Sequence, residues 1–117
     1  MGKLSASDIA VVAAQAGFTG PDLQVAVAVA LAESSGNPAA VGDVNVPVAG
    51  AQSTGLWQIN SHFHPEFAGQ DLTDPQTNAN AAYSVYTAAG SSFSPWSTYK
   101  NGAYSAYIVQ AQEGVNA

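Results

Sequence analysis

The chain has 117 residues, of which 47% are apolar and 9% charged, with a formal net charge of -6 and no cysteine. This length predicts a single domain over residues 1–117, the apolar content argues against disorder, and the lack of cysteine excludes disulfides and thiol chemistry. Two lysines and no arginine against eight acidic residues argue against nucleic acid as a partner and disfavour anionic membranes.

Two helices are predicted in the first third of the chain. Ser5 and Asp8 have the spacing of a capping box, and apolar residues follow at helical spacing up to Gly17. Polar residues interrupt this short apolar run, so neither a signal peptide nor a membrane span is expected. Pro21 opens a second helix whose run of Val and Ala indicates burial, and which ends at Gly36.

Residues 39–53 differ in composition from the helical segments before them. Valines are mixed with Gly, Asp, Asn and Pro, which predicts a loop or a small β-hairpin. A short helix is predicted to begin near Thr54. The expected fold class is therefore mainly α, with a small loop or β-hairpin insertion around residues 39–53.

The last third of the chain is again helical. Asp74 as N-cap and Pro75 as first residue predict a helix that runs to Gly90. A short turn is expected at residues 94–99. A final helix carries apolar side chains on one face and is predicted to stop at Gly114.

Glu33 is one of only three glutamates and closes an apolar helix. It is either an ordinary charge at a helix end or an acid whose pKa is raised. Ala26, Val29 and Ala30 share its helical face, so the carboxyl is expected to be desolvated. A negative charge in the last helical turn also faces the negative end of the helix dipole. Both effects raise the pKa, as a general acid at neutral pH requires.

His62, His64 and Glu66 in the segment HFHPEF could form part of a metal site. Pro65 marks this segment as a loop, however, and the chain has no third His and no Cys to complete a site. We therefore expect no functional metal; a metal hydrolase here would be sensitive to a chelator. No cofactor is expected either, since a phosphate-loop lysine is absent, and no Gly-x-Ser-x-Gly motif supports a serine hydrolase.

Aromatic residues are spread over the later two-thirds of the chain, and most are expected in the core. Trp57, Trp96 and Tyr99 lie beside polar turn residues, and flat rings next to amides are typical of sugar recognition. Taken singly, each of these rings is more often a packing residue.

Four segments, taken together, resemble the soluble lytic transglycosylase (SLT) domain, which has the lysozyme-like fold. That family carries a helix ending in Glu-Ser, then Asn-Pro, a Gly-Leu-Met/Trp-Gln-Ile stretch, an Asn- and Ala-rich helix and an Ala-Tyr-Asn-x-Gly-like turn. The order and spacing match over roughly residues 22–108, and the segments that carry the match read ALAESSGNPAA, STGLWQIN, DPQTNANAAYSVY and WSTYKNGAY. The resemblance implies an α+β lysozyme-like fold and cleavage of the β-1,4 bond between N-acetylmuramic acid and N-acetylglucosamine in peptidoglycan.

The resemblance also implies roles for individual residues. Glu33 matches the family's single catalytic acid/base. Gln58 and the backbone at Gly55 and Leu56 match positions near the acetamido groups of the glycan, and Trp57 lies in the same block. Tyr99 matches a tyrosine close to the catalytic glutamate and the sugar, while Ser34 is expected to support the helix end rather than to react.

Two departures from the family pattern leave the reaction outcome open. The segment between Glu33 and Gly55 is longer than usual and contains Asp43, which is either a turn residue or a second carboxylate that positions water. Lys100 replaces the asparagine that follows the family's tyrosine. Both a lytic transglycosylase and a lysozyme (muramidase) therefore fit, and the alternative is a non-catalytic glycan-binding or structural module of a phage tail or secretion apparatus.

The expected partner is the peptidoglycan glycan strand, and the expected place of action is the bacterial cell wall. Because the net charge is -6 and the wall is anionic, unaided affinity for the wall is expected to be weak. Wall binding is therefore expected to come from a separate wall-binding domain or a phage particle. Without a signal peptide, delivery by phage, another release route or a trimmed chain is expected.

Overall fold

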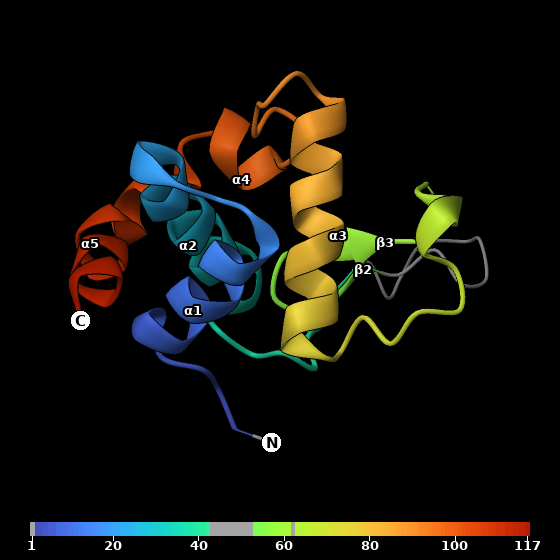
Figure 1. The fold of residues 1–117 in the computed structure, drawn as a ribbon, viewed down its shortest axis with the longest axis horizontal. Helices are drawn as coiled ribbons and strands as arrows, with labels where there is room; N and C mark the ends of the chain where they lie inside the picture. Colours follow the sequence, from blue (N-terminus) through green and yellow to red (C-terminus); the bar gives the residue numbers. More distant parts are fainter. Residues whose placement is uncertain (1, 43–52, 62) are drawn as a thin grey trace.

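The protein is described by a computed structural model for residues 2–42, 53–61 and 63–117, and within these residues it is mainly helical with one small sheet (Figure 1). This agrees with the predicted mainly α fold class. The α-helices are α1 (Ala6–Ala16), α2 (Gly20–Ser34), α3 (Pro75–Ala88), α4 (Ser97–Lys100) and α5 (Ile108–Asn116). The sheet consists of β1 (Val41–Gly42), β2 (Ser53–Thr54) and β3 (Ile59–Asn60), and two 3-10 helices are η1 (Pro65–Phe67) and η2 (Ala103–Tyr107).

The first and third helices begin where the sequence predicts. The Ser5 hydroxyl caps α1 by accepting a hydrogen bond from the Asp8 amide at 3.2 Å. The Asp74 carboxylate caps α3 by accepting from both the amide and the hydroxyl of Thr77, at 2.9 and 2.8 Å. These caps satisfy amide groups that have no partner inside the first helical turn.

Helix α2 forms the centre of the core. Residues 26–31 are each at most 4% exposed, because α1, α4, α5 and η2 all pack against this helix. A helix that is apolar on every side is stable only when it is covered all round. Its C-terminal end is marked by Ser35 in the left-handed conformation, with φ 55.

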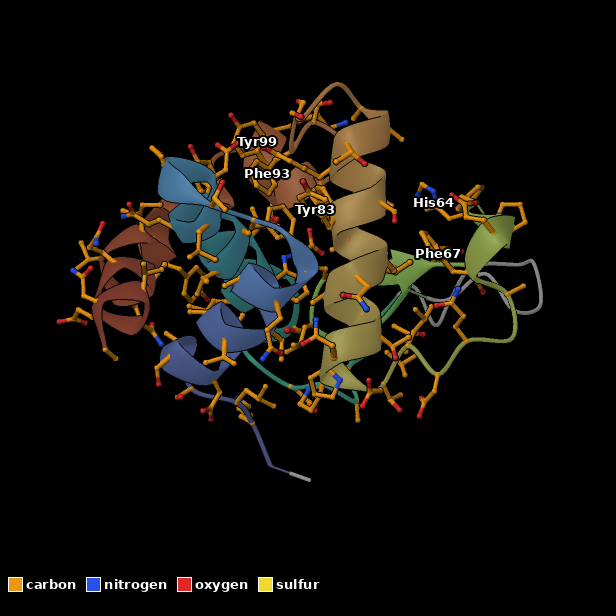
Figure 2. The ribbon with its side chains drawn as sticks, viewed as in Figure 1. His64, Phe67, Tyr83, Phe93 and Tyr99 are labelled. Carbon is orange, nitrogen blue, oxygen red and sulfur yellow. The ribbon has the colours of Figure 1, made fainter. Side chains whose placement is uncertain are left out.

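Aromatic side chains connect this core to α3 and the sheet. Phe18 is 1% exposed and packs on the rings of Tyr83 and Tyr86, with centroids at 5.1 and 5.0 Å. Phe93 extends the cluster toward α4, 5.8 Å from Phe18 (Figure 2). The sheet lies on the far side of α3 from α1 and α5 (Figure 1).

The short helix predicted from Thr54 is wrong, because this segment forms an antiparallel ladder. Thr54 pairs with Val41 of β1 and with Ile59 of β3. Between β2 and β3 the chain makes a tight turn in which Gly55 and Gln58 have φ +84 and +51. Left-handed residues cannot continue a right-handed helix. The β part of the predicted insertion is thus confirmed at its two ends, while residues 43–52 lie outside the described part.

The predicted end of the last helix at Gly114 is also wrong. Helix α5 runs through Gly114 to Asn116, and Gly114 is buried against Ala6 of α1, where a Cβ atom would clash with the Ala6 backbone. This glycine therefore permits close helix packing and does not end the helix. None of the helices in the described residues has the length and apolar content needed to cross a membrane.

Candidate active site

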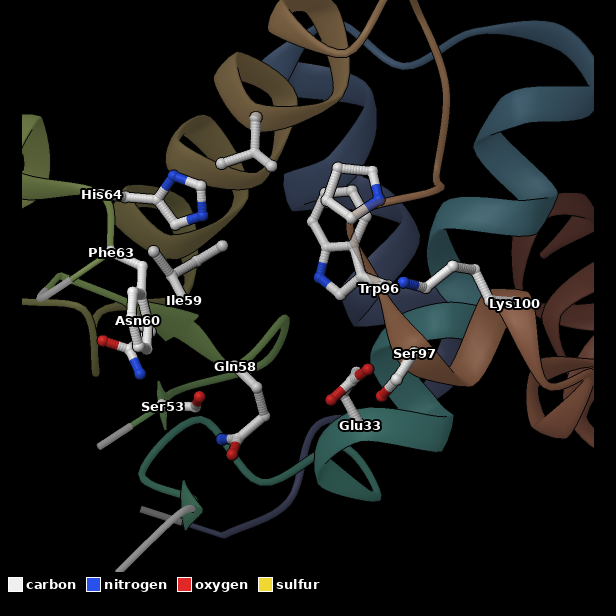
Figure 3. Close-up of a pocket in the computed structure, with 12 residues that line it drawn as sticks. Glu33, Ser53, Gln58, Ile59, Asn60, Phe63, His64, Trp96, Ser97 and Lys100 are labelled. Carbon is white, nitrogen blue, oxygen red and sulfur yellow. The ribbon is translucent and has the colours of Figure 1, made fainter. Parts of the chain in front are cut away.

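A cleft of about 420 Å³ contains Glu33 and is bounded by two different kinds of structure (Figure 3). One side, here called the helical wall, comes from the end of α2 and from α4 with the residues before it. The other, called the sheet wall, comes from β2, β3 and the segment that follows. The helical wall presents Glu33, Pro95, Trp96, Ser97 and Lys100, and the sheet wall presents Ser53, Gln58, Ile59, Asn60, Phe63 and His64. Val85 of α3 also lines the cleft.

The Glu33 carboxyl group points into the cleft from the last turn of α2 (Figure 3). The side chain is half-buried, and the Thr98 hydroxyl of α4 donates a hydrogen bond to its Oε2 at 2.8 Å. Thr98 was not singled out from the sequence, since a threonine 65 residues away carries no local signal of this contact. The elevated pKa of Glu33 stays a prediction.

Ser34 is buried beside Glu33 but is not among the residues that line the cleft. Its hydroxyl donates to the Ala30 carbonyl at 2.9 Å and accepts from the Gly36 amide at 3.3 Å. Both bonds close the end of α2, so this hydroxyl supports the helix end that carries Glu33.

Gln58 lines the cleft, and its side-chain amide braces the sheet wall. Its Nε2 donates to the carbonyls of Ala40 and Gly55, each at 3.0 Å, and the Gly55 amide donates to the same Ala40 carbonyl at 2.8 Å. Leu56 is fully buried. Gly55 and Leu56 therefore shape the turn from inside the protein and do not line the cleft.

A buried asparagine from α3 holds this turn in place. Asn78 is 0% exposed, and its Nδ2 donates to the carbonyls of Thr54 and Leu72, each at 2.8 Å. Its Oδ1 accepts from the Trp57 amide at 2.9 Å. The sequence did offer a signal, because Asn78 stands on the apolar face of an Ala-rich helix, where a polar side chain needs buried partners.

Trp57, which lies in the predicted substrate-binding block, is a core residue in the structure. Its side chain is 0% exposed, and its indole Nε1 donates to the Ala26 carbonyl of α2 at 3.0 Å. Trp96 is 5% exposed and donates from its own Nε1 to the Trp57 carbonyl at 2.9 Å. The two indoles therefore tie α2, the β2–β3 turn and the helical wall together.

The predicted place of Tyr99 close to Glu33 and the sugar stays a prediction. Tyr99 stacks on Tyr104 and packs on Phe93, with ring centroids at 4.9 and 5.7 Å, and it is not among the residues that line the cleft (Figure 2). Adjacent residues on a helix point about 100° apart, so when Thr98 faces Glu33, Tyr99 turns toward the aromatic cluster.

The cleft contains residues that the sequence patterns did not favour. Phe63 is 71% exposed on the sheet wall, and Lys100, one of two lysines in the chain, lines the helical wall. His64 also lines the cleft, whereas Glu66 is exposed outside its lining. In the described residues no group of three or more potential metal ligands exists; His62 and Asp43 lie outside those residues.

Comparison with known proteins identifies the family. A search of curated proteins and a search of solved structures found no match. A family model described as a lysozyme-like domain matches residues 10–98, which include Glu33, the β2–β3 turn and all of α3. The chain therefore belongs to the lysozyme-like domain family, whose activity at the level of the family is that of a peptidoglycan glycosidase.

Proposed function

We propose that this domain cleaves the β-1,4 bond between N-acetylmuramic acid and N-acetylglucosamine in peptidoglycan, with Glu33 as general acid and base. The observation that carries the proposal is the Glu33 carboxyl group at the end of α2, inside a cleft and held by Thr98 at 2.8 Å. Membership of the lysozyme-like family supports the substrate class.

Glu33 would act in two steps. Protonated Glu33 first gives its proton to the glycosidic oxygen as the bond from that oxygen to the muramic acid C1 breaks. The resulting carboxylate then takes a proton from the muramic acid 6-hydroxyl, which attacks C1 and gives a 1,6-anhydro product, or from water, which gives hydrolysis. The Thr98 hydroxyl suits both steps, because a hydroxyl can donate to a carboxylate and accept from a carboxylic acid.

The proposal includes both a lytic transglycosylase and a lysozyme outcome. Among the described residues that line the cleft, Glu33 is the one carboxylate. Hydrolytic glycosidases usually have a second carboxylate, which in inverting enzymes activates water, and Asp43 is the candidate for it. Mass spectrometry of digested peptidoglycan distinguishes the outcomes, since an anhydro end is one water lighter than a hydrolysed reducing end.

We also propose that a separate wall-binding domain or a phage particle supplies the affinity of this domain for the cell wall. The net charge of -6 supports this, because like charge on the wall repels the domain at low ionic strength.

The substitution Glu33→Gln tests the chemistry directly. Glutamine keeps the size of the side chain but cannot donate an acidic proton, so clearing of cell-wall suspensions should fall roughly 10²–10⁴-fold. Glu113→Gln, at an exposed site on α5, is the matched control and should stay at the wild-type rate. Equal activity of the Glu33→Gln and wild-type proteins would reject the proposed mechanism.

A further inference from the structure

Phe63 combines high exposure with a place in the cleft. Of the large apolar side chains exposed in the described residues, Phe63 at 71% is the one that lines the cleft with Glu33. Single exposed apolar side chains are common on protein surfaces, so exposure alone would assign nothing. Here the exposed ring lies on the wall opposite Glu33 (Figure 3), where a bound chain molecule would pass it.

The surroundings of Phe63 are polar. Ser53, Gln58, Asn60 and His64 share the sheet wall with it, and these side chains carry hydroxyl, amide and imidazole groups. A flat apolar ring beside hydrogen-bonding groups matches the surface of a pyranose sugar, which has C–H groups on its faces and hydroxyl or acetamido groups on its edge.

We propose that Phe63 binds the C–H face of one N-acetylhexosamine ring and forms a sugar subsite on the sheet wall across from Glu33. The inference rests on the proposed function, because it takes the glycan strand as the ligand. The sugar ring would cover apolar surface that water contacts in the free protein, and removing such surface from water favours binding.

This subsite would act through binding rather than chemistry. The Phe63 ring carries no group that could exchange a proton with the scissile bond, so its contact with the sugar is the same in the ground state and in the transition state. Interactions of this kind lower KM and leave kcat unchanged. Loss of the ring should therefore raise KM for glycan strands.

The test measures binding in the Glu33→Gln background, where cleavage does not consume the ligand. The probe is a set of purified peptidoglycan glycan strands of defined length, freed of peptide, measured by calorimetry. We expect Phe63→Ala to weaken binding about tenfold or more, as for the lost burial of one aromatic side chain. Phe63→Tyr should restore most of the affinity, because it keeps the ring.

Val109→Ala is the matched control, since Val109 is 70% exposed and does not line the cleft. The affinity of this variant should equal that of the Glu33→Gln parent protein. Thermal unfolding should show that both alanine variants are folded. Equal binding with and without the Phe63 ring, or no binding by the parent, overturns the subsite. If binding depends on Phe63 but the wild-type protein does not cleave the glycan, the subsite is supported and the proposed function is rejected.

Discussion

The two walls of the cleft are built by different means. The helical wall is formed by α2, a fifteen-residue helix, and by the short helix α4. The Thr98 hydroxyl of α4 donates a hydrogen bond to Glu33. The sheet wall consists of strands of two residues each, which are too short to be stable alone. It is held by side chains from elsewhere, chiefly Asn78 of α3. The helical wall is thus supported by a core helix, and the sheet wall by a few buried hydrogen bonds.

Of the substitutions considered, Asn78→Ala should destabilise the sheet wall most. Asn78→Ala leaves the Trp57 amide and the Thr54 and Leu72 carbonyls without this partner. The free energy of unfolding should fall by about 3 kcal/mol, since each buried group left unsatisfied costs roughly 1–3 kcal/mol. Urea unfolding measures this. Asn80→Ala, at an exposed site on the same helix, should change it little, and equal losses at both sites would contradict the assignment.

Gly55→Ala should disturb the same turn somewhat less. Gly55 has φ +84, and a Cβ atom there would overlap the Asn78 side chain and the Leu72 carbonyl. We expect a loss of about 2 kcal/mol in stability, from the left-handed backbone together with the crowding. Gly90→Ala separates the two causes, because Gly90 has φ +78 and open space around it. Similar losses at both glycines would show that crowding contributes nothing.

Thr98→Val tests the hydrogen bond that holds Glu33 on the helical wall. Valine keeps the shape but removes the hydroxyl that donates to Glu33, so the carboxyl is held less firmly. The kcat for peptidoglycan should fall by roughly tenfold, since a hydrogen bond to a charged group is worth about 1.5–3 kcal/mol. Thr98→Ser should recover most of the rate while losing only the methyl group. A serine variant as impaired as the valine variant would point to packing instead.

The smallest effect concerns the cap of α3, the helix that carries Asn78. Hydrogen bonds from the Thr77 amide and hydroxyl lower the pKa of Asp74 below its ordinary value of 3.8. A lowered pKa in the folded state gives stability that is present above 3.8 and is lost as the pH falls below it. Asp74→Asn, which caps without titrating, should therefore lose less thermal stability than wild type on acidification. An identical pH dependence would exclude this contribution.

The aromatic residues show how far sequence reasoning reaches. Trp57, Trp96 and Tyr99 were singled out because they lie beside polar turn residues. In the structure Trp96 lines the cleft, Trp57 is fully buried and Tyr99 joins the Phe93 cluster. Phe63 was not favoured, yet it is the exposed ring in the cleft. Residue type and local polarity do not report which face of a ring is covered, because that depends on the segments packed above it.

The sequence by itself determined the helical fold class, the caps at Ser5 and Asp74, the family and the choice of Glu33 as candidate acid. These features are encoded within a few consecutive residues, through backbone preferences, capping hydrogen bonds and motif order. Only the tertiary structure decided that the segment after Thr54 turns back as a strand pair and that Thr98 meets Glu33. Such contacts join residues far apart in the chain, so they exist only once α2, α3 and α4 have packed together.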